Sequence, residues 1–512
     1  MLVRIRTFAL LGIDAVAVDV EVDVSPSAQQ KTILVGLPEA AVRESTHRVS
    51  RAIVNSGYVE TSTNMIINLA PADLPKHAAS FDLPISIGVL CATRQLKSEL
   101  LDDYAMIGEL ALDGTMRPVK GVLPVALAAA QMGLRGLIVP QENAREAAVV
   151  ENIDIIPVTC LAQAAGFLAE TLAIDTYPSI GLQMFEEHSV YESDYADVRG
   201  QESAKRAITV AAAGGHNVLM IGPPGTGKTM LAKRFGGVLP KMELAEALET
   251  TRVFSVLGYT KDTPLIVTRP FREPHHTISE AGLVGGSSPP QPGEISMAHN
   301  GVLFLDELPE FNRRTLEVLR QPLEDGTVTI SRATRTSTFP ANFILIAALN
   351  PCPCGYRNDP RRECHCNTIQ IQRYMSKISG PLLDRIDIHI EVPPVDYNEL
   401  SSAAAAGTSS AQIREQVIAT REFQAKRFAK SKARYNADMS HRQIQQHCRI
   451  DHEGHQILKT AMNDYGLSAR AHDKILRIAR TIADLEQAEN IQTHHLFEAI
   501  AYRTLDRKLW AG

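Results

Sequence analysis

The sequence predicts an α/β fold whose core is a parallel sheet, preceded by an α+β domain and followed by a helical lid. Three observations lead to this prediction. Residues 222–229 form a glycine-rich phosphate-binding motif between an apolar run and a helical segment. The run Val302–Leu305 is continuously apolar, as in a buried parallel strand, and ends in two acidic residues. Residues 396–512 carry helical rather than strand-like periodicity.

Length and charge limit the possible classes of protein. The chain has 512 residues, and at ~150 residues per domain this length predicts about three domains. The formal net charge of −6 excludes a basic surface over the whole molecule, so any nucleic-acid site must be a local patch. No apolar segment approaches the ~18 residues of a membrane span, and Asp14 interrupts any signal-peptide core. We therefore predict a cytoplasmic protein without a membrane partner.

Residues 1–175 are predicted to form the α+β domain. In Ala15–Val24, valines alternate with acidic residues, which is typical of a half-buried strand. Helical and strand-like stretches then follow one another without a fixed repeat. Pro178, Gly181 and an acidic stretch mark residues 176–194 as a linker.

The predicted core, residues 195–395, is organised around the phosphate-binding motif. The motif consists of Gly222, Pro223, Pro224, Gly225, Thr226, Gly227, Lys228 and Thr229. Glycines let the backbone approach phosphates, and the N–H groups of the loop and of the next helix hold negative charge. We expect ATP here, with Lys228 at the β- and γ-phosphates and the Thr229 hydroxyl on Mg²⁺. A chance glycine-rich turn is the alternative.

Asp306 and Glu307 follow the buried strand, at the carboxyl end where α/β sheets bind ligands. Asp306 is expected to hold Mg²⁺, directly or through water. Glu307 is expected to polarise the attacking water as the general base. The alternative is a strand that ends in solvated acids.

Two more residues suit the chemistry of the γ-phosphate. Asn350 ends the predicted strand Phe343–Leu349 and is placed to sense that phosphate, although asparagine before proline is also an ordinary turn residue. Arg385 fits an arginine finger that acts on the nucleotide of a neighbouring subunit. An ion pair with Asp384 or Asp387 is the alternative for Arg385.

Four of the seven cysteines crowd into one short segment. They are Cys352, Cys354, Cys364 and Cys366. Four thiolates suit a tetrahedral structural zinc, with His365 as a further candidate ligand, and a reducing compartment favours metal over disulfides. The C-x-C spacing is tighter than usual, and a reduced or redox-labile thiol cluster is the alternative. A zinc ion here would fix a loop close to Asn350 and would not act in catalysis.

The segment Thr327–Phe339 is rich in β-branched residues and predicts a hairpin with Arg332 and Arg335 near its tip. Arginines at this position suit DNA phosphates, and a solvated hairpin is the alternative. His275 and His276 point in different directions if they lie on regular structure. We therefore favour a structural or DNA-facing role for them over metal binding or acid–base chemistry.

The predicted lid, residues 396–512, begins with a low-complexity connector, Ser401–Ser410. A basic run with interleaved aromatic residues, 421–435, suits nucleic acid or a solvated helix face. Ser468 is a predicted N-cap. The helix that follows it carries an apolar stripe between Ile475 and Ala483.

A family resemblance rests on four strings. They are Phe271–Ser279, Pro292–Glu307, Leu319–Asp325 and Asn350–Gly355. The chain is similar over nearly its whole length to AAA+ ATPases of the Mg-chelatase-like branch, and within it to the YifB/ComM family. The resemblance implies a homo-oligomeric ring, expected to be a hexamer, with each ATP site shared between neighbours. It implies sensor 1 for Asn350, the arginine finger for Arg385, and for Arg470 a sensor 2 that reaches from lid to γ-phosphate.

Residues 75–76 and 108–121 resemble the proteolytic domain of Lon protease. Ser80 lies near the position of the Lon nucleophile, but residues 123–125 are Leu, Pro and Val where the lysine base should be. The resemblance therefore implies a Lon-like fold without the catalytic dyad.

The function expected from these features is an ATP-hydrolysing ring motor on single-stranded or branched DNA. The family likeness implies a branch migration helicase in homologous recombination or natural transformation. A protein-remodelling ATPase similar to magnesium chelatase is the first alternative. An ATP-dependent protease is the second, and the missing lysine disfavours it.

Overall fold

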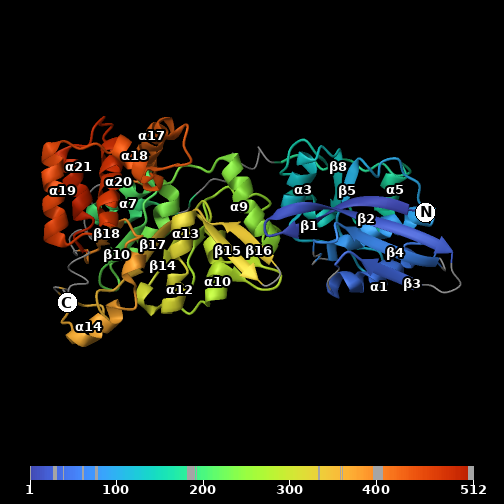
Figure 1. The fold of residues 1–512 in the computed structure, drawn as a ribbon, viewed down its shortest axis with the longest axis horizontal. Helices are drawn as coiled ribbons and strands as arrows, with labels where there is room; N and C mark the ends of the chain where they lie inside the picture. Colours follow the sequence, from blue (N-terminus) through green and yellow to red (C-terminus); the bar gives the residue numbers. More distant parts are fainter. Residues whose placement is uncertain are drawn as a thin grey trace.

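The computed structural model of the protein describes residues 2–26, 31–37, 40–59, 63–74, 76, 79–180, 191, 193–332, 335–357, 359, 361–395 and 407–505. The molecule is elongated (Figure 1). The amino-terminal part forms one end, the helical carboxyl-terminal part forms the other, and a parallel sheet lies between them.

The amino-terminal part contains a four-stranded sheet that packs against a buried helix. In spatial order the strands are β1 (Leu2–Leu11), β2 (Asp14–Pro26), β4 (Thr63–Ala70) and β3 (Lys31–Val35). Helix α2 (Asp82–Ala92) is buried along its length against this sheet, and α1 (Ala40–Asn55) packs on α2. The predicted alternation in β2 is confirmed, because Val18, Val20 and Val22 are fully buried while the acidic residues between them are partly exposed.

A second, smaller sheet completes this part of the chain. Its parallel strands are β5 (Tyr104–Met106), β8 (Gly136–Pro140) and β9 (Asp154–Val158). Its helices are α3 (Val122–Gln131), α4 (Ala144–Ala147) and α5 (Leu161–Leu168), and β6 (Glu109–Leu110) pairs with β7 (Met116–Arg117). The amino-terminal part therefore mixes helices with both parallel and antiparallel strands.

The core is a five-stranded sheet in which all strands run parallel. In spatial order they are β11 (Phe271–Arg272), β14 (Val302–Leu305), β17 (Ile344–Leu349), β10 (Val218–Ile221) and β18 (Ile388–Glu391). Helix α7 (Glu202–Gly214) precedes β10 in the chain, and α8 (Lys228–Arg234) and α9 (Leu244–Leu257) lie between β10 and β11. Because the strands are parallel, their carboxyl ends meet at one edge, where the predicted phosphate-binding motif, Asp306 and Asn350 all lie.

Short elements are inserted before and after β14. They are α10 (Glu280–Val284), β12 (Gly285–Gly286), β13 (Gln291–Pro292), α11 (Glu294–Met297), α12 (Arg313–Glu317) and α13 (Arg320–Asp325). The predicted hairpin is present as β15 (Thr327–Arg332) and β16 (Arg335–Pro340), with Arg332 paired to Arg335 across the tip. Helices α14 (Thr368–Met375) and α15 (Gly380–Leu383) lead to β18.

The carboxyl-terminal part is helical, as predicted. Its helices are α17 (Ser410–Phe428), α18 (His441–His447), α19 (His452–Tyr465), α20 (Ala469–Leu485) and α21 (Thr493–Ala501). Ser468 caps α20 by accepting the N–H of Ala471, which confirms the predicted N-cap. The apolar stripe from Ile475 to Ala483 is buried as expected. Residues 401–406 of the predicted connector lie outside the described residues.

The amino-terminal part and the core share one apolar cluster. Phe8 and Val122 pack with Met242 and Leu265 in this cluster, and α3 lies against α9. The N–H of Gly121, which precedes α3, donates to the carbonyl oxygen of Ser255 in α9 (3.0 Å). The two parts are therefore joined by a packed apolar interface. Among the described helices, none combines the length and apolar character that crossing a membrane requires.

Candidate nucleotide-binding site

The phosphate-binding motif forms the connection between β10 and α8. Helix α8 begins at Lys228, so its amino end opens directly onto the loop. Gly227 has a φ of +89°, a left-handed conformation that residues other than glycine rarely adopt. A Cβ on Gly222 would lie 2.2 Å from the carbonyl oxygen of Val392, so only glycine fits against the neighbouring strand. The strand, loop and helix expected from the sequence are all present.

Lys228 and Asn350 meet at the carboxyl edge of the sheet. The Lys228 Nζ donates to the carbonyl oxygens of Gly222 (2.7 Å) and Pro223 (2.8 Å) and to Asn350 Oδ1 (3.2 Å). Burial lowers the pKa of Lys228 to about 8, although Asp306 and Glu307 act to raise it. A loop of backbone N–H groups with an ammonium group and an amide beside it suits the phosphates of a nucleotide.

Thr229 and Asp306 are in direct contact. The Thr229 hydroxyl donates to Asp306 Oδ2 at 2.8 Å, so the two predicted magnesium ligands lie side by side. A hydroxyl and a carboxylate are hard oxygen ligands of the kind that Mg²⁺ prefers together with phosphate oxygens and water. These residues fit a magnesium–nucleotide complex.

Glu307 stands at the end of β14 with its side chain about half exposed (52 %). Its backbone is left-handed (φ 51°), and its N–H donates to Asp306 Oδ1 (2.9 Å). His276 Nδ1 lies 3.7 Å from Glu307 Oε2, and the rings of His275 and His276 lie 4.1 Å apart, centroid to centroid. The expectation that the two histidines point in different directions assumed regular structure, and it does not apply here because they lie in an irregular segment after β11. Nothing in the sequence indicates that His276 reaches the predicted general base.

A cavity of about 810 Å³ lies beside the phosphate-binding motif. Its walls come from four places in the chain: residues 197–201, the motif with the start of α8, the cysteine-containing loop after β17, and residues 394–395 after β18. Its volume is in the range of small-molecule sites. The loop after β17 contributes Tyr356, Arg361 and Arg362, none of which the sequence had indicated.

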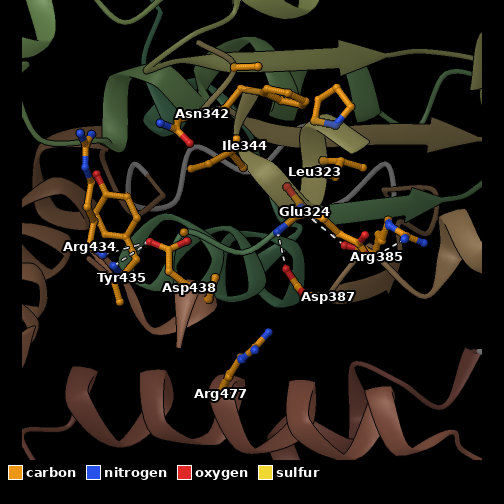
Figure 2. A pocket seen from close by; sticks show the side chains of 18 of the residues that line it. Leu323, Glu324, Asn342, Ile344, Arg385, Asp387, Arg434, Tyr435, Asp438 and Arg477 are labelled. Atoms are coloured by element: carbon orange, nitrogen blue, oxygen red, sulfur yellow. Dashed lines mark hydrogen bonds and ion pairs between the residues drawn. The ribbon is translucent and has the colours of Figure 1, made fainter. Parts of the chain in front are cut away.

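Arg385 and Arg470 lie in a different cavity, of about 720 Å³. Arg385 pairs with Glu324, and the Arg470 guanidinium lies 3.9 Å from the same carboxylate. Figure 2 shows Arg385 and Glu324 pointing toward one another, with Arg477 extending from α20 into the same space. The alternative of an ion pair between Arg385 and Asp384 or Asp387 is not seen among the described residues: Arg385 pairs with Glu324, and Asp387 pairs with Lys474 (2.8 Å).

This second cavity is at the opposite edge of the sheet. Asn217 immediately precedes β10, and its Nδ2 donates to the carbonyl oxygen of Arg385 (3.3 Å). The phosphate-binding motif begins directly after the other end of the same strand. The structure therefore brings Lys228, Thr229, Asp306, Glu307 and Asn350 together within one chain, and places Arg385 and Arg470 away from them.

The four cysteines converge on one point. Cys352 Sγ lies 3.3 Å from Cys354 Sγ and 3.7 Å from Cys364 Sγ, and the Sγ atoms of Cys354 and Cys364 are 3.6 Å apart. With Cys366, all four lie within 4.8 Å of one another. A tetrahedral zinc site with Zn–S bonds of about 2.3 Å has sulfur–sulfur edges of about 3.8 Å. The backbone N–H of Tyr356 is the main cause that lowers the pKa of Cys354 to about 6, which favours a thiolate. The cluster fits zinc.

A second group of possible ligands, Glu486 with His494 and His495, does not fit a metal. His495 Nδ1 accepts the N–H of Gln492 (2.9 Å), so its hydrogen sits on Nε2, which contacts Glu486 Oε2 (3.0 Å). Both ring nitrogens of His495 are thus used in hydrogen bonds. The group stabilises the start of α21.

Two residues of the predicted basic run make packing contacts, one between lid and core and one within the lid. The Arg421 guanidinium donates to the carbonyl oxygen of Ala212 and lies over the ring of Tyr435, at 4.1 Å from its centroid. Arg427 pairs with the buried carboxylate of Asp484 (2.6 Å). These two arginines therefore serve packing. The side chains of Arg332 and Arg335 lie outside what the structure describes.

The amino-terminal residues at the positions expected from Lon protease take part in packing and in hydrogen bonds to the backbone. Lys76 is buried, and its Nζ donates to the carbonyl oxygens of Gly36 (2.9 Å) and Leu69 (2.8 Å). Leu123 is fully buried in the cluster shared with the core. Ser80 lies in a short 3-10 helix, and its carbonyl oxygen accepts the N–H of Gly108 (3.0 Å).

Comparison with known families covers most of the chain. The model "Magnesium chelatase, subunit ChlI" matches residues 194–400, "Subunit ChlI of Mg-chelatase" matches residues 20–143, and "Magnesium chelatase, subunit ChlI C-terminal" matches residues 407–503.

Individual relatives point the same way. The competence protein ComM of Haemophilus influenzae is 44 % identical over 508 residues, which are 98 % of this chain and 97 % of that protein. The uncharacterized protein YifB of Escherichia coli is 43 % identical over 507 residues, 99 % of this chain and 97 % of its own. The zygotic DNA replication licensing factor mcm6-A of Xenopus laevis is 21 % identical over 352 residues, 63 % of this chain and 38 % of its own.

Proposed function

The chain belongs to the magnesium chelatase subunit ChlI family, with YifB and ComM as relatives, and we propose that it is a ring-forming motor that moves DNA strands. Membership of this AAA+ family makes the protein an ATPase. The finer proposal is a hexameric branch migration helicase that acts on single-stranded or branched DNA in homologous recombination or natural transformation. We place it in the cytoplasm, where thiolates stay reduced.

The ATP chemistry is assigned to residues at the carboxyl edge of the sheet. The motif Gly222–Thr229 binds the phosphates, with Lys228 neutralising their charge. Thr229 and Asp306, which already touch, hold Mg²⁺. Glu307 activates the attacking water, and Asn350, hydrogen-bonded to Lys228, senses the γ-phosphate.

The division of the site between two edges of one sheet is the observation that carries the ring proposal. Arg385 and Arg470 lie at the amino edge, beside Asn217, whereas Lys228 lies at the carboxyl edge. In a ring, the amino edge of one subunit faces the nucleotide of the next. Arg385 then acts as an arginine finger in the neighbour's site, and Arg470 reaches the γ-phosphate of the same nucleotide.

The DNA part of the proposal is supported by the β15–β16 hairpin and by the relatives. One relative is named a competence protein, and a more distant one is named a DNA replication licensing factor. Arg332 and Arg335, at the hairpin tip, are proposed to contact DNA phosphates. The second candidate is a remodelling ATPase that acts on protein, similar to magnesium chelatase, for which the matching family models are named.

DNA is expected to stimulate ATP turnover, and this experiment separates the two candidates. Turnover is measured without DNA, with single-stranded DNA and with a branched junction, and Lys228→Ala is the inactive control. Strong stimulation by DNA is expected for the motor. An equal rate under all three conditions would contradict the DNA proposal and favour remodelling of a protein partner.

Changing both hairpin arginines, Arg332 and Arg335, to alanine is expected to weaken DNA binding by a similar factor for all DNA sequences. On single-stranded DNA, the salt slope of log affinity should fall by about 0.7 for each phosphate that the variant no longer neutralises. Thr329→Ala, on the same hairpin but away from the tip, is the matched control. An unchanged salt slope in the double variant would remove these arginines from the DNA site.

Nucleotide affinity is expected to fall as the pH rises above about 8, the pKa of Lys228. The ammonium group is charged below this pH and attracts phosphates; above it the group becomes neutral. The apparent affinity for ADP should decline by up to about tenfold per pH unit. Lys228→Arg stays charged throughout, so its affinity, whatever its absolute value, should be constant between pH 7 and 9. A constant wild-type affinity would contradict this role of Lys228.

A further inference from the structure

The four-cysteine loop runs from Cys352 to Cys366, and its residues Tyr356, Asp359, Arg361 and Arg362 form one wall of the nucleotide cavity. We propose that a zinc ion in this loop and a nucleotide in the cavity bind cooperatively, because the loop presents Tyr356 and Arg362 to the nucleoside. This inference rests on the proposed ATPase site. It goes beyond that site by assigning a nucleoside contact to the loop and by giving the cysteines a part in nucleotide affinity.

The loop is seated directly on the phosphate-binding motif. It begins two residues after Asn350, which contacts Lys228. Gly355 has a φ of +85°, and a Cβ added to it would lie 2.6 Å from Cδ of Pro224. Because Gly355 packs this closely against the ring of Pro224, a displacement of the cysteine loop moves a wall of the cavity and presses on the motif itself.

Tyr356 and Arg362 are in contact with each other within that wall and are treated as one unit. Arg362 Nη1 donates to the Tyr356 hydroxyl at 2.7 Å, and the guanidinium lies 5.0 Å from the centroid of the ring. Both residues line the cavity together with Gly225 and Met230. An aromatic ring with an arginine plane beside it is the kind of surface on which a purine base stacks. We assign this unit to the nucleoside of the bound nucleotide.

Cys354 and Cys364 determine the position of Tyr356 and Arg362 in the cavity wall. Cys354 lies two residues before Tyr356 and accepts its backbone N–H, and Cys364 lies two residues after Arg362. A zinc ion held by both thiolates closes the segment between them into a loop. Arg361, next to Arg362, donates to the carbonyl oxygen of Val395 at 2.9 Å and ties the loop to the end of β18.

Binding at two coupled sites is reciprocal. If zinc raises the affinity for ADP by a given factor, ADP must raise the affinity for zinc by the same factor, which is roughly 5- to 150-fold for typical couplings. The proposal therefore has two independent readouts, neither of which needs ATP turnover.

The first experiment measures zinc and ADP on the full chain. The zinc affinity is measured by equilibrium competition with a coloured chelator, with and without saturating ADP, and the ADP affinity is compared before and after zinc is removed. ADP should raise the zinc affinity, and zinc removal should weaken ADP binding by the same factor. The inference would be overturned by finding no zinc, or by a zinc affinity that is insensitive to ADP. Wild-type protein that binds no ADP would instead contradict the proposed ATPase site.

The second experiment separates the nucleoside contact from the phosphate contact. Tyr356→Ala and Arg362→Ala should weaken ADP binding by roughly tenfold, the scale of one base–aromatic contact, and leave inorganic pyrophosphate binding unchanged. Arg145→Ala, an exposed residue of the amino-terminal part, and Cys160→Ser, a cysteine outside the cluster, are the controls. Neither Tyr356 nor Arg362 is buried, so we expect both variants to unfold at the wild-type temperature, and thermal unfolding checks this. Equal losses for ADP and pyrophosphate would contradict the nucleoside assignment.

Discussion

Glu307→Gln is expected to bind ATP with nearly unchanged affinity and to hydrolyse it about 10²- to 10⁴-fold more slowly, the usual contribution of a general base. The substitution removes the carboxylate that accepts a proton from water and keeps the shape of the side chain. Lys228, Thr229 and Asp306 are held by contacts that do not involve the Glu307 side chain, so the phosphate site should persist.

The measurement is single-turnover hydrolysis together with nucleotide affinity. Glu310→Gln is the matched control: it lies three residues further on, is exposed, and pairs with Lys377 (3.3 Å). It should hydrolyse ATP at the wild-type rate. Normal turnover by Glu307→Gln would show that another group activates the water, and His276, 3.7 Å from Glu307, would be the first residue to test.

Arg385→Ala is expected to lower turnover by about 10³-fold or more, the scale of an arginine finger. The loss has an unusual geometric origin, because Arg385 lies at the amino edge of the sheet and does not reach the phosphate-binding motif of its own chain. The variant should therefore retain an intact phosphate site and still bind ATP. Its defect should lie in the nucleotide site of the neighbouring subunit.

Mixing two inactive variants tests this origin directly. Arg385→Ala keeps its own phosphate site, and Lys228→Ala keeps its arginine. In a random equal mixture, about a quarter of the sites should combine an intact motif with an intact arginine from the next subunit. Turnover should reappear in the mixture and remain absent in each variant alone. A mixture as inactive as its components would contradict the shared site.

Features that depend only on neighbouring residues in the sequence were predictable from it. The strand β10, the motif and α8 follow one another without interruption, and the alternation in β2 fixes which face is buried. The stripe on α20 is likewise a property of a single helix.

Contacts between distant segments were not predictable in the same way. Arg385 pairs with Glu324, sixty-one positions away, and not with the acids beside it. The sequence cannot indicate such a pair, because it depends on how α13 and α15 are placed at the amino edge of the sheet. The directions of His275 and His276 could not be predicted for a related reason, since a side chain in an irregular segment has no periodicity to follow.

The interface between α3 and α9 has a practical consequence for dissecting this protein. Met242 and Leu265 of the core are buried in the same cluster as Phe8 and Val122 of the amino-terminal part. A fragment cut in the linker would place these side chains in water, and a contiguous apolar patch of this kind promotes aggregation. Biochemical work on the ATPase should therefore keep the amino-terminal part attached, because it shields apolar side chains of the core from water.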